Sequence, residues 1–154
     1  MYCTSLKTPV GTLQLFADDD ALYRIIFPSC GNNLPVAGPA PEGHPLLGSV
    51  SLQLSEYFTG HRQNFDLPLS PQGTTFQLTV WELMQQIPYG ETSTYGKIAA
   101  GLGDPNKARA VGGAANKNPL PLVIPCHRVM GAKGKLTGFA GGLETKQFLL
   151  TLEA

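Results

Sequence analysis

A thiol, an imidazole and a guanidinium stand side by side in the tetrapeptide Pro125-Cys126-His127-Arg128. A cysteine thiol is mostly protonated at neutral pH, and it becomes a strong nucleophile when a neighbouring base or positive charge favours the thiolate. His127 offers the base and Arg128 the charge, so the pattern indicates a reactive cysteine. The alternative is a structural cysteine buried beside a hydrogen-bonded histidine, because free cysteine is often a core residue.

The charges are divided unevenly, although the chain of 154 residues has no net charge. Residues 1–75 carry three basic and six acidic side chains, whereas residues 76–154 carry eight basic and five acidic ones. Between residues 95 and 135, seven Lys and Arg residues stand against Asp104 alone. Such a local positive field favours a polyanionic partner, although a solvated surface without a partner gives the same pattern.

Composition argues against several classes of protein. No apolar run approaches the roughly 20 residues of a membrane helix, and the first residues do not form a signal peptide. We therefore expect a soluble, cytoplasmic protein with no membrane partner. The three cysteines are too far apart in sequence for a disulfide framework, and an odd count suits a reducing compartment.

A metal site is an alternative use for the dispersed cysteines and histidines. Its ligands would be Cys3, Cys30, His44 and His61, but their spacing matches no compact metal-binding pattern. We therefore expect neither a metal nor another cofactor.

The first half of the chain predicts a small unit without chemistry of its own. Short apolar runs predict strands at 12–17 and 21–27, which the Asp18-Asp19-Asp20 turn would join as a hairpin. Residues 30–45 are rich in Gly, Pro and Asn and are predicted to form a loop. A helical spacing of apolar residues then predicts a helix over 47–58.

The second half follows a linker rich in small and polar residues, so we expect domains at 1–70 and 76–154 joined by residues 71–75. A tight turn at Gly103-Asp104-Pro105 separates two short predicted helices, which is the outline of a helix-turn-helix. Apolar periodicity and capping signals predict helices at 76–88, 94–102, 106–116 and 143–152.

The helix predicted at 106–116 has an unusual surface. Its adjacent Gly112 and Gly113 cost roughly 1 kcal/mol each relative to alanine, so some gain should offset the missing side chains. A surface of Ala and Gly with one long cation, Arg109, suits close approach to a narrow groove of a nucleic acid. The alternative is a small-residue face packed tightly on another helix, and the two can coexist.

Three prolines precede the cysteine: Pro119, Pro121 and Pro125. Because proline breaks a helix and restricts the residue before it, segment 118–126 is predicted to be extended and largely buried. It would deliver Cys126 to a fixed place. The glycines after residue 130 predict loops with room for a ligand close to the backbone.

Together these residues resemble the O6-alkylguanine-DNA alkyltransferases, also called methylated-DNA-protein-cysteine methyltransferases. The resemblance covers 76–154 in order, whereas 1–70 offers no diagnostic motif. It implies an α/β (α+β) fold with a small amino-terminal three-stranded β/α, ribonuclease H-like domain and a mostly helical domain containing a winged helix-turn-helix. The matching stretches are Ala108–Ala114, Asn118-Pro119, Ile124–Val129, Gly138–Leu143 and Lys146.

The resemblance implies a repair reaction on double-stranded DNA that contains O6-alkylguanine. The thiolate of Cys126 would displace guanine from the alkyl carbon, and because the thioether is stable the protein would be used once. His127 would act through a water as the base, and Glu153 would orient it. Tyr95 would protonate or hydrogen-bond the departing guanine, and Asn118 would be the hinge between the recognition helix and the nucleophile.

The resemblance also implies how DNA is held. The damaged base would rotate out of the stack, and Arg109 would fill its place. The recognition helix would lie in the minor groove, where Gly112 and Gly113 permit close approach. Tyr95 and Arg128 are further candidate DNA contacts. We expect a monomer.

Recognition of the flipped base would come mainly from the main chain, through the carbonyls of Cys126 and Val129 and the amide of Ala140. Phe139 would pack beside the base. Some members of the family carry Tyr-Ser where this chain has Phe139-Ala140, so reaction rate and preference among adducts are the properties that this difference affects.

Two alternatives belong to other classes of protein. In a helix-turn-helix regulator Cys126 would be incidental, but the Gly-Gly face and the lack of a dimerisation segment argue against sequence-selective operator binding. A Cys-His hydrolase would turn over an ester or peptide substrate repeatedly instead of being consumed.

Overall fold

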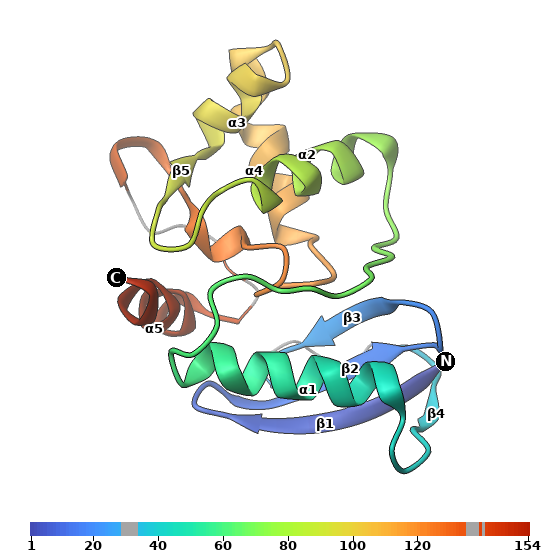
Figure 1. Ribbon diagram of the computed structural model, residues 1–154. Coiled ribbons are helices and arrows are strands. Elements are labelled where there is room, and N and C mark those ends of the chain that lie inside the picture. The colour runs from blue at the N-terminus through green and yellow to red at the C-terminus, as the bar shows by residue number, and fades with distance from the viewer. Residues whose placement is uncertain (29–33, 135–138, 140) are drawn as a thin grey trace. The chain divides into compact units, whose positions relative to one another are not determined.

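The computed structural model describes residues 1–28, 34–134, 139 and 141–154. The chain forms two compact units, Met1–Pro71 and Gln72–Ala154, and each is described by itself (Figure 1). The boundary between them falls at the start of the segment expected to be a linker. None of the helices in the described ranges is long and apolar enough to cross a membrane.

The first unit is built on an antiparallel meander of three strands, β1 (Tyr2–Thr8), β2 (Gly11–Ala17) and β3 (Leu22–Ile26). The predicted acidic turn joins β2 to β3, because one carboxylate oxygen of Asp18 accepts hydrogen bonds from the backbone N–H groups of Asp20 and Ala21. This Asx-type turn is a local signal, and it explains why the hairpin could be predicted from sequence.

A short fourth strand, β4 (Gly38–Pro39), pairs in parallel with β1, so the sheet order is β3-β2-β1-β4. The sheet therefore has one strand more than the three that were expected, and this strand lies within the predicted loop 30–45. Glycine and proline disfavour strands, and β4 is held by backbone bonds on its flanks, from Gly38 N–H to the Met1 carbonyl and from Ala40 N–H to the Cys3 carbonyl.

Helix α1 (Pro45–Phe58) runs across one face of the sheet (Figure 1). It begins two residues before the predicted start because proline suits the first helical turn and the His44 side chain accepts a hydrogen bond from Leu47 N–H. Its buried residues are Leu47, Val50, Gln53, Leu54, Tyr57 and Phe58. They form the core of this unit together with fully buried sheet residues such as Leu13 and Leu15.

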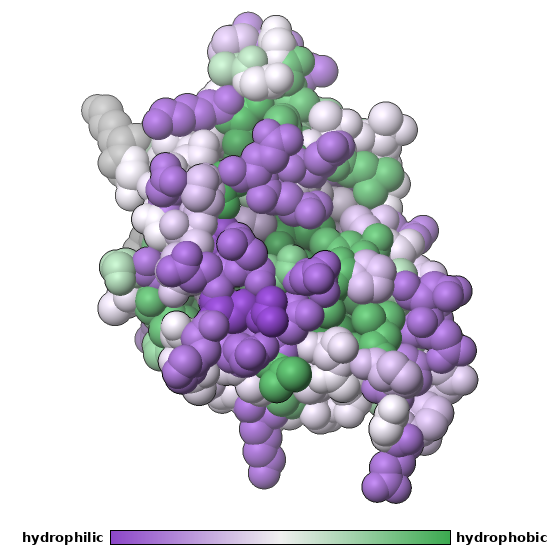
Figure 2. All heavy atoms as spheres, in the orientation of Figure 1, coloured by the Kyte–Doolittle hydropathy of each residue, from purple (hydrophilic) through white to green (hydrophobic). Residues whose placement is uncertain are grey.

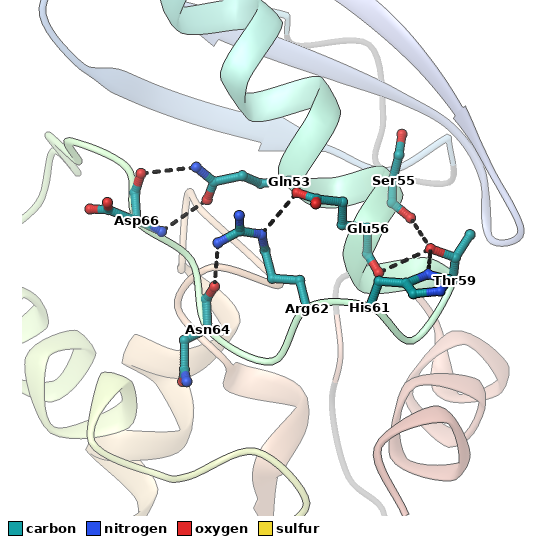
Figure 3. Close-up of polar contacts among 8 residues, drawn as sticks. All are labelled: Gln53, Ser55, Glu56, Thr59, His61, Arg62, Asn64 and Asp66. Carbon is teal, nitrogen blue, oxygen red and sulfur yellow. Dashed lines mark hydrogen bonds and ion pairs between the residues drawn. The ribbon is translucent and has the colours of Figure 1, made fainter.

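Polar contacts fix the chain after α1 (Figure 3). The Gln53 side chain bonds both the N–H and the carbonyl of Asp66, at 2.9 and 3.0 Å. Arg62 bridges Glu56 and the Asn64 carbonyl. These contacts tie the segment that leaves the unit to the helix, and they involve no cluster suited to catalysis.

The second unit begins with α2 (Thr75–Gln85), whose capping box pairs Thr74 with Gln77 in both directions. The helix buries Val80, Trp81 and Met84. The indole N–H of Trp81 donates to the Ala114 carbonyl at 2.8 Å and so ties α2 to the fourth helix.

The helix-turn-helix consists of α3 (Tyr95–Gly101), capped by Thr94, and α4 (Ala108–Asn116). The prediction of a single helix over 106–116 was wrong at its start, because Pro105–Lys107 form a separate 3-10 turn, η1. Asp104 caps that turn by accepting from Asn106 N–H, and Lys107 departs from α-helical geometry, so α4 starts only at Ala108.

The segment before the cysteine was predicted to be extended, and this was wrong. Residues 120–124 fold into a turn closed by a bond from Ile124 N–H to the Leu120 carbonyl, and Leu122 takes a left-handed φ of 76°. The prediction failed because the Asn118 side chain supplies a donor and an acceptor that stabilise the turn. The segment is buried as expected at Leu120, Leu122 and Ile124.

Cys126–Arg128 form a 3-10 turn, η2, which leads directly into β6 (Val129–Met130). Strand β6 pairs in parallel with β5 (Ser93–Thr94), which immediately precedes Tyr95. This small ladder joins the start of the helix-turn-helix to the cysteine segment. A further 3-10 turn, η3, covers Ala132–Gly134.

The last helix, α5 (Leu143–Glu153), buries only part of the apolar face that was expected from its sequence. Leu143 is 51% exposed and Phe148 is 40% exposed, whereas the buried positions are Lys146, Leu149 and Glu153. Two charged side chains therefore point inward from this helix. Figure 2 shows hydrophilic residues over most of the visible surface, with hydrophobic patches between them.

Candidate functional site

Cys126 lies at the start of η2 with only 7% of its surface exposed. Burial raises the pKa of its thiol to about 11, and a hydrogen bond from the Asn118 side chain and the positive charge of Lys146 oppose this shift. The resting thiol is therefore protonated at neutral pH. Reaction requires a base that removes the proton when an electrophile is present.

The imidazole of His127 meets the carboxylate of Glu153 inside the second unit. The distance from His127 Nε2 to Glu153 Oε2 is 2.6 Å, and both side chains are buried. Because the carboxylate can only accept hydrogen bonds, Nε2 carries the proton and Nδ1 keeps its lone pair. Nδ1 is buried and has no hydrogen-bond partner among the described residues.

The electrostatic surroundings keep His127 neutral. Burial lowers the pKa of the imidazole, Glu153 raises it, and the charges of Arg128 and Lys146 lower it further. The net shift is downward, so at neutral pH the ring is an unprotonated base with Nδ1 available. An acidic residue that orients such a histidine is the arrangement that general-base catalysis needs.

Arg128 does not lie where the sequence prediction placed it. It was expected to contact a nucleic acid, but only 6% of it is exposed. Its guanidinium bonds both carboxylate oxygens of Glu153, at 2.7 and 3.0 Å, and the Ile87 carbonyl at 2.7 Å. A buried guanidinium with these partners cannot reach a phosphate, so Arg128 holds Glu153 instead.

Asn118 follows the end of α4 and is buried with both ends of its amide engaged. Nδ2 donates to the Ile124 carbonyl at 2.8 Å, and Oδ1 accepts from Leu120 N–H at 2.9 Å. The side chain also lowers the pKa of the Cys126 thiol by hydrogen bonding to it. Asn118 therefore connects the end of α4 to the turn that precedes the cysteine, which is the place that the resemblance assigned to a hinge residue.

Lys146 is a residue whose role the sequence analysis missed. It is fully buried, and its ammonium donates to the Val129 carbonyl at 2.7 Å. Burial lowers the pKa of the amine, and Cys126 raises it. The spacing of Lys146, Leu149 and Glu153 at i, i+3 and i+7 places the three on one helix face, and that periodicity was the available signal.

A groove of about 1000 Å³ lies between the start of α3 and one face of α4. Tyr95 is half-buried and Arg109 is exposed. A Cβ atom built on Gly112 would lie 4.0 Å from the Tyr95 ring, and one on Gly113 would meet nothing within 4 Å. Packing therefore does not require glycine at 113, which favours the open-groove interpretation over tight helix packing. The lining residues are Thr94, Tyr95, Gly96, Ala108, Arg109, Gly112, Gly113, Asn116, Gly131 and Ala132.

Asn116 is a second residue that sequence reasoning missed. It is exposed on the groove side of α4, seven residues after Arg109, and its amide makes no hydrogen bond within the described part of the chain. This contrasts with the fully engaged Asn118. The i, i+3, i+4, i+7 series that starts at Arg109 was the sequence signal for it.

The structure describes some of the remaining predicted residues and leaves others outside the described ranges. The Val129 carbonyl, proposed as a base contact, accepts from Lys146, and a carbonyl oxygen retains a second lone pair. Phe139 is half-buried, and its carbonyl accepts from Gly142 N–H at 2.9 Å. Ala140 and Cys30 lie outside the described residues. No group of three or more His, Cys, Asp and Glu side chains suited to a metal occurs within the described ranges.

The fold and the site together define a two-unit protein with a protected nucleophilic cysteine behind a helix-turn-helix. The chain belongs to the 6-O-methylguanine DNA methyltransferase family. The DNA binding domain of that family matches residues 75–154, and its ribonuclease-like domain matches residues 1–71. The predicted fold class, with a ribonuclease-like sheet domain and a helical domain, is confirmed.

Similar proteins extend over the whole chain. A methylated-DNA-protein-cysteine methyltransferase of Methanosarcina acetivorans is 44% identical over 153 residues, which cover 99% of this chain and 98% of the relative. A protein of the same name from Mycobacterium bovis is 50% identical over 149 residues, with 97% and 90% covered. The crystal structure of Mycobacterium tuberculosis OGT in complex with DNA matches with a TM-score of 0.92 and 39% identity, covering 99% of this chain and 92% of that one.

Proposed function

We propose that this protein repairs O6-alkylguanine, chiefly O6-methylguanine, in double-stranded DNA by transferring the alkyl group irreversibly to its own Cys126. The observation that carries the proposal is the 2.6 Å contact between His127 Nε2 and Glu153, because it leaves His127 Nδ1 as a base beside a buried thiol. Membership of the methyltransferase family supports the substrate class.

The reaction begins with removal of the thiol proton, which passes through a water to His127 Nδ1. The thiolate then attacks the alkyl carbon from the side opposite O6. The C–O6 bond breaks, its electron pair stays on guanine, and guanine N1 takes up a proton from solvent, while His127 afterwards returns the thiol proton to solvent and becomes neutral again. Tyr95 assists the departure by donating a hydrogen bond. The product is a thioether, which no base in the site can cleave, so each molecule acts once.

The high pKa of the thiol has a role in this scheme. A protonated, buried thiol resists oxidation and adventitious alkylation, because the thiolate is the reactive form. Asn118 and the charge of Lys146 stabilise the thiolate once His127 has taken the proton. Glu153 balances the charge of the imidazolium that forms, and Arg128 holds Glu153 in place.

DNA would occupy the groove between α3 and α4. Flipping the damaged nucleotide costs a few kcal/mol of stacking and pairing, and Arg109 would replace the base in the stack. The side-chain-free surface at Gly112 and Gly113 lets α4 approach the floor of the minor groove. Asn116, two turns along the same face, can donate to acceptors on the base edges there.

The flipped base would be recognised through the carbonyls of Cys126 and Val129, the amide of Ala140 and packing against Phe139. We assign all of the chemistry and DNA binding to residues 76–154, linked by residues 71–75 to an accessory domain at 1–70. We place the protein in the cytoplasm, because reduced cysteines suit that compartment. We also propose that it acts as a monomer.

The experiment is intact-mass analysis after incubation with excess duplex DNA containing O6-methylguanine. We expect a gain of one methyl group per protein molecule and then no further reaction. Repeated turnover of an ester or peptide substrate, with no gain in mass, would instead support a Cys-His hydrolase.

A further inference from the structure

The segment Ile87–Gly90, between α2 and β5, contacts the residues that hold Glu153. The Ile87 carbonyl accepts from Arg128, and the Tyr89 ring lies under the same guanidinium, 5.7 Å from its centroid to Cζ. The Tyr89 hydroxyl donates to the Leu152 carbonyl at 3.3 Å. The segment therefore contacts both Arg128, which bonds the Glu153 carboxylate, and the last turn of α5, which carries Glu153.

Gly90 approaches the same helix end even more closely. It takes a left-handed φ of 81°, and a Cβ atom built on it would lie 3.1 Å from the Glu153 carbonyl oxygen. Such a separation is tighter than a side chain tolerates without displacement of its neighbour. The backbone of the last turn of α5 therefore rests directly on Gly90.

Glu153 needs this support because of its position. It is the last residue of α5, where helices fray and the final carbonyls lack intrahelical partners. Its carboxylate nevertheless has to stay at 2.6 Å from His127. A misplacement of about 1 Å in a catalytic group can cost on the order of a hundredfold in rate.

We propose that Tyr89 and Gly90 are positioning residues for alkyl transfer, which hold the last turn of α5 so that Glu153 stays bonded to His127. This rests on the proposed function. Among the residues that the structure describes, the charged groups that act on His127 are Glu153 and Lys146 on α5 and Arg128 on η2, and the Cys126 thiol is its neighbour in sequence. Among them Glu153 alone raises the pKa of His127.

The sign of the effect follows from that contact. When Glu153 moves away, the pKa of His127 falls further below its ordinary value. Activity that depends on neutral His127 then persists to lower pH, although it is slower at every pH because the ring is a weaker and poorly oriented base. Simple loss of folded protein would lower the amplitude and leave the midpoint of the pH profile in place.

Gly90→Ala is the main test, and Gly60→Ala is its matched control. Gly60 has a φ of 80°, and a Cβ atom there meets nothing within 4 Å, so the control carries the same backbone strain without the contact. We expect Gly90→Ala to slow single-turnover methyl transfer by about tenfold to a hundredfold. The acid limb of the pH profile of its transfer rate should also move to lower pH. Gly60→Ala should stay within about twofold of the wild type.

Tyr89→Phe and Tyr89→Leu separate the hydroxyl from the ring. The phenylalanine keeps the ring under Arg128 and loses one hydrogen bond, so a reduction of about twofold to fivefold is expected. The leucine loses both and should resemble Gly90→Ala. Equal effects of Gly90→Ala and Gly60→Ala, or a wild-type acid limb in the slowed variants, would overturn the proposal.

Nitrogen NMR of labelled histidine gives a readout that needs no substrate. The wild type should show His127 protonated at Nε2 only, and Gly90→Ala should lower the pKa of the ring and broaden that signal. If Gly90→Ala changes the His127 signals but the wild type transfers no alkyl group, the proposed function fails, and only the support of the His127–Glu153 contact by Gly90 stands. If transfer occurs and the His127 signals of Gly90→Ala match the wild type, the positioning role fails alone.

Discussion

Glu153 Oε2 accepts a 2.6 Å hydrogen bond from His127 Nε2 while the same carboxylate is held by two nitrogens of Arg128. One buried carboxylate therefore accepts hydrogen bonds from two groups: the guanidinium of Arg128, which is always charged, and the imidazole of His127, which becomes charged during the reaction. This arrangement makes Glu153 both a structural anchor and a part of the proton relay, and the two roles can be separated by measurement.

Glu153→Gln should lower stability as well as activity. The substitution leaves the Arg128 charge buried without its carboxylate, and breaking a buried ion pair from one side costs about 3 kcal/mol. Urea unfolding measures this loss. Glu144→Gln is the control, because Glu144 is exposed in the first turn of the same helix and should change the free energy of unfolding little. Equal stability of the two variants would contradict the anchoring role.

Lys146→Met should make the thiol harder to ionise. The Lys146 charge lowers the pKa of Cys126, so its removal should raise that pKa above about 11 and slow iodoacetamide labelling of Cys126 near neutral pH, where the amine is charged, by roughly tenfold per pKa unit. The exposed Lys7 provides the control as Lys7→Met. An unchanged labelling profile in Lys146→Met would show that its charge does not reach the thiol.

The raised thiol pKa predicts a loss of stability in alkali. The folded pKa of Cys126 is about 11 and the ordinary value is 9.0, so between these values the folded state binds more protons than the unfolded state. Stability should therefore fall as pH rises through this window, by up to roughly 3 kcal/mol from this group. Cys126→Ser should lose less stability than the wild type between pH 9 and 11, as followed by urea unfolding. If the free energies of unfolding of Cys126→Ser and the wild type fell in parallel between pH 9 and 11, the raised pKa of the Cys126 thiol would be contradicted.

Arg109→Ala should impair repair of duplex DNA far more than reaction with free O6-methylguanine. Base flipping costs a few kcal/mol, and the exposed arginine is the residue that would fill the vacated stack. Single-turnover rates with both substrates, compared as a ratio, measure the effect, which we expect to exceed about tenfold. Arg24→Ala, an exposed arginine of the first unit, is the control. Equal losses on both substrates would refute the flipping role.

Local signals explain most of what the sequence predicted about the fold. Thr74 with Gln77, Thr94 and Asp104 bond to neighbours within three residues, so these caps could be anticipated. The turn at 120–124 could not, because proline content alone suggested an extended chain. It depends on an Asn118 amide that reaches six residues forward.

The resemblance supplied the candidate site residues, and the sequence could not predict which charged side chains are buried. A lone arginine or lysine suggests a solvated side chain. Arg128 is buried only because Glu153, 25 residues away, meets it, and Lys146 is buried with the Val129 carbonyl 17 residues away. Arg128 has no local pattern that marks it as buried, and Lys146 has only its place on the helix face of Leu149 and Glu153. The long-range pairs explain why Arg128 was assigned to DNA and Lys146 received no role.

The most direct test of the account is to map the transferred group by peptide mass spectrometry after reaction with duplex DNA containing O6-methylguanine. Wild-type protein and Cys3→Ser should both carry one methyl thioether on Cys126, and Cys126→Ser should carry none while remaining folded and able to bind DNA. A methyl group on Cys3 or Cys30, or transfer that persists in Cys126→Ser, would contradict the central claim.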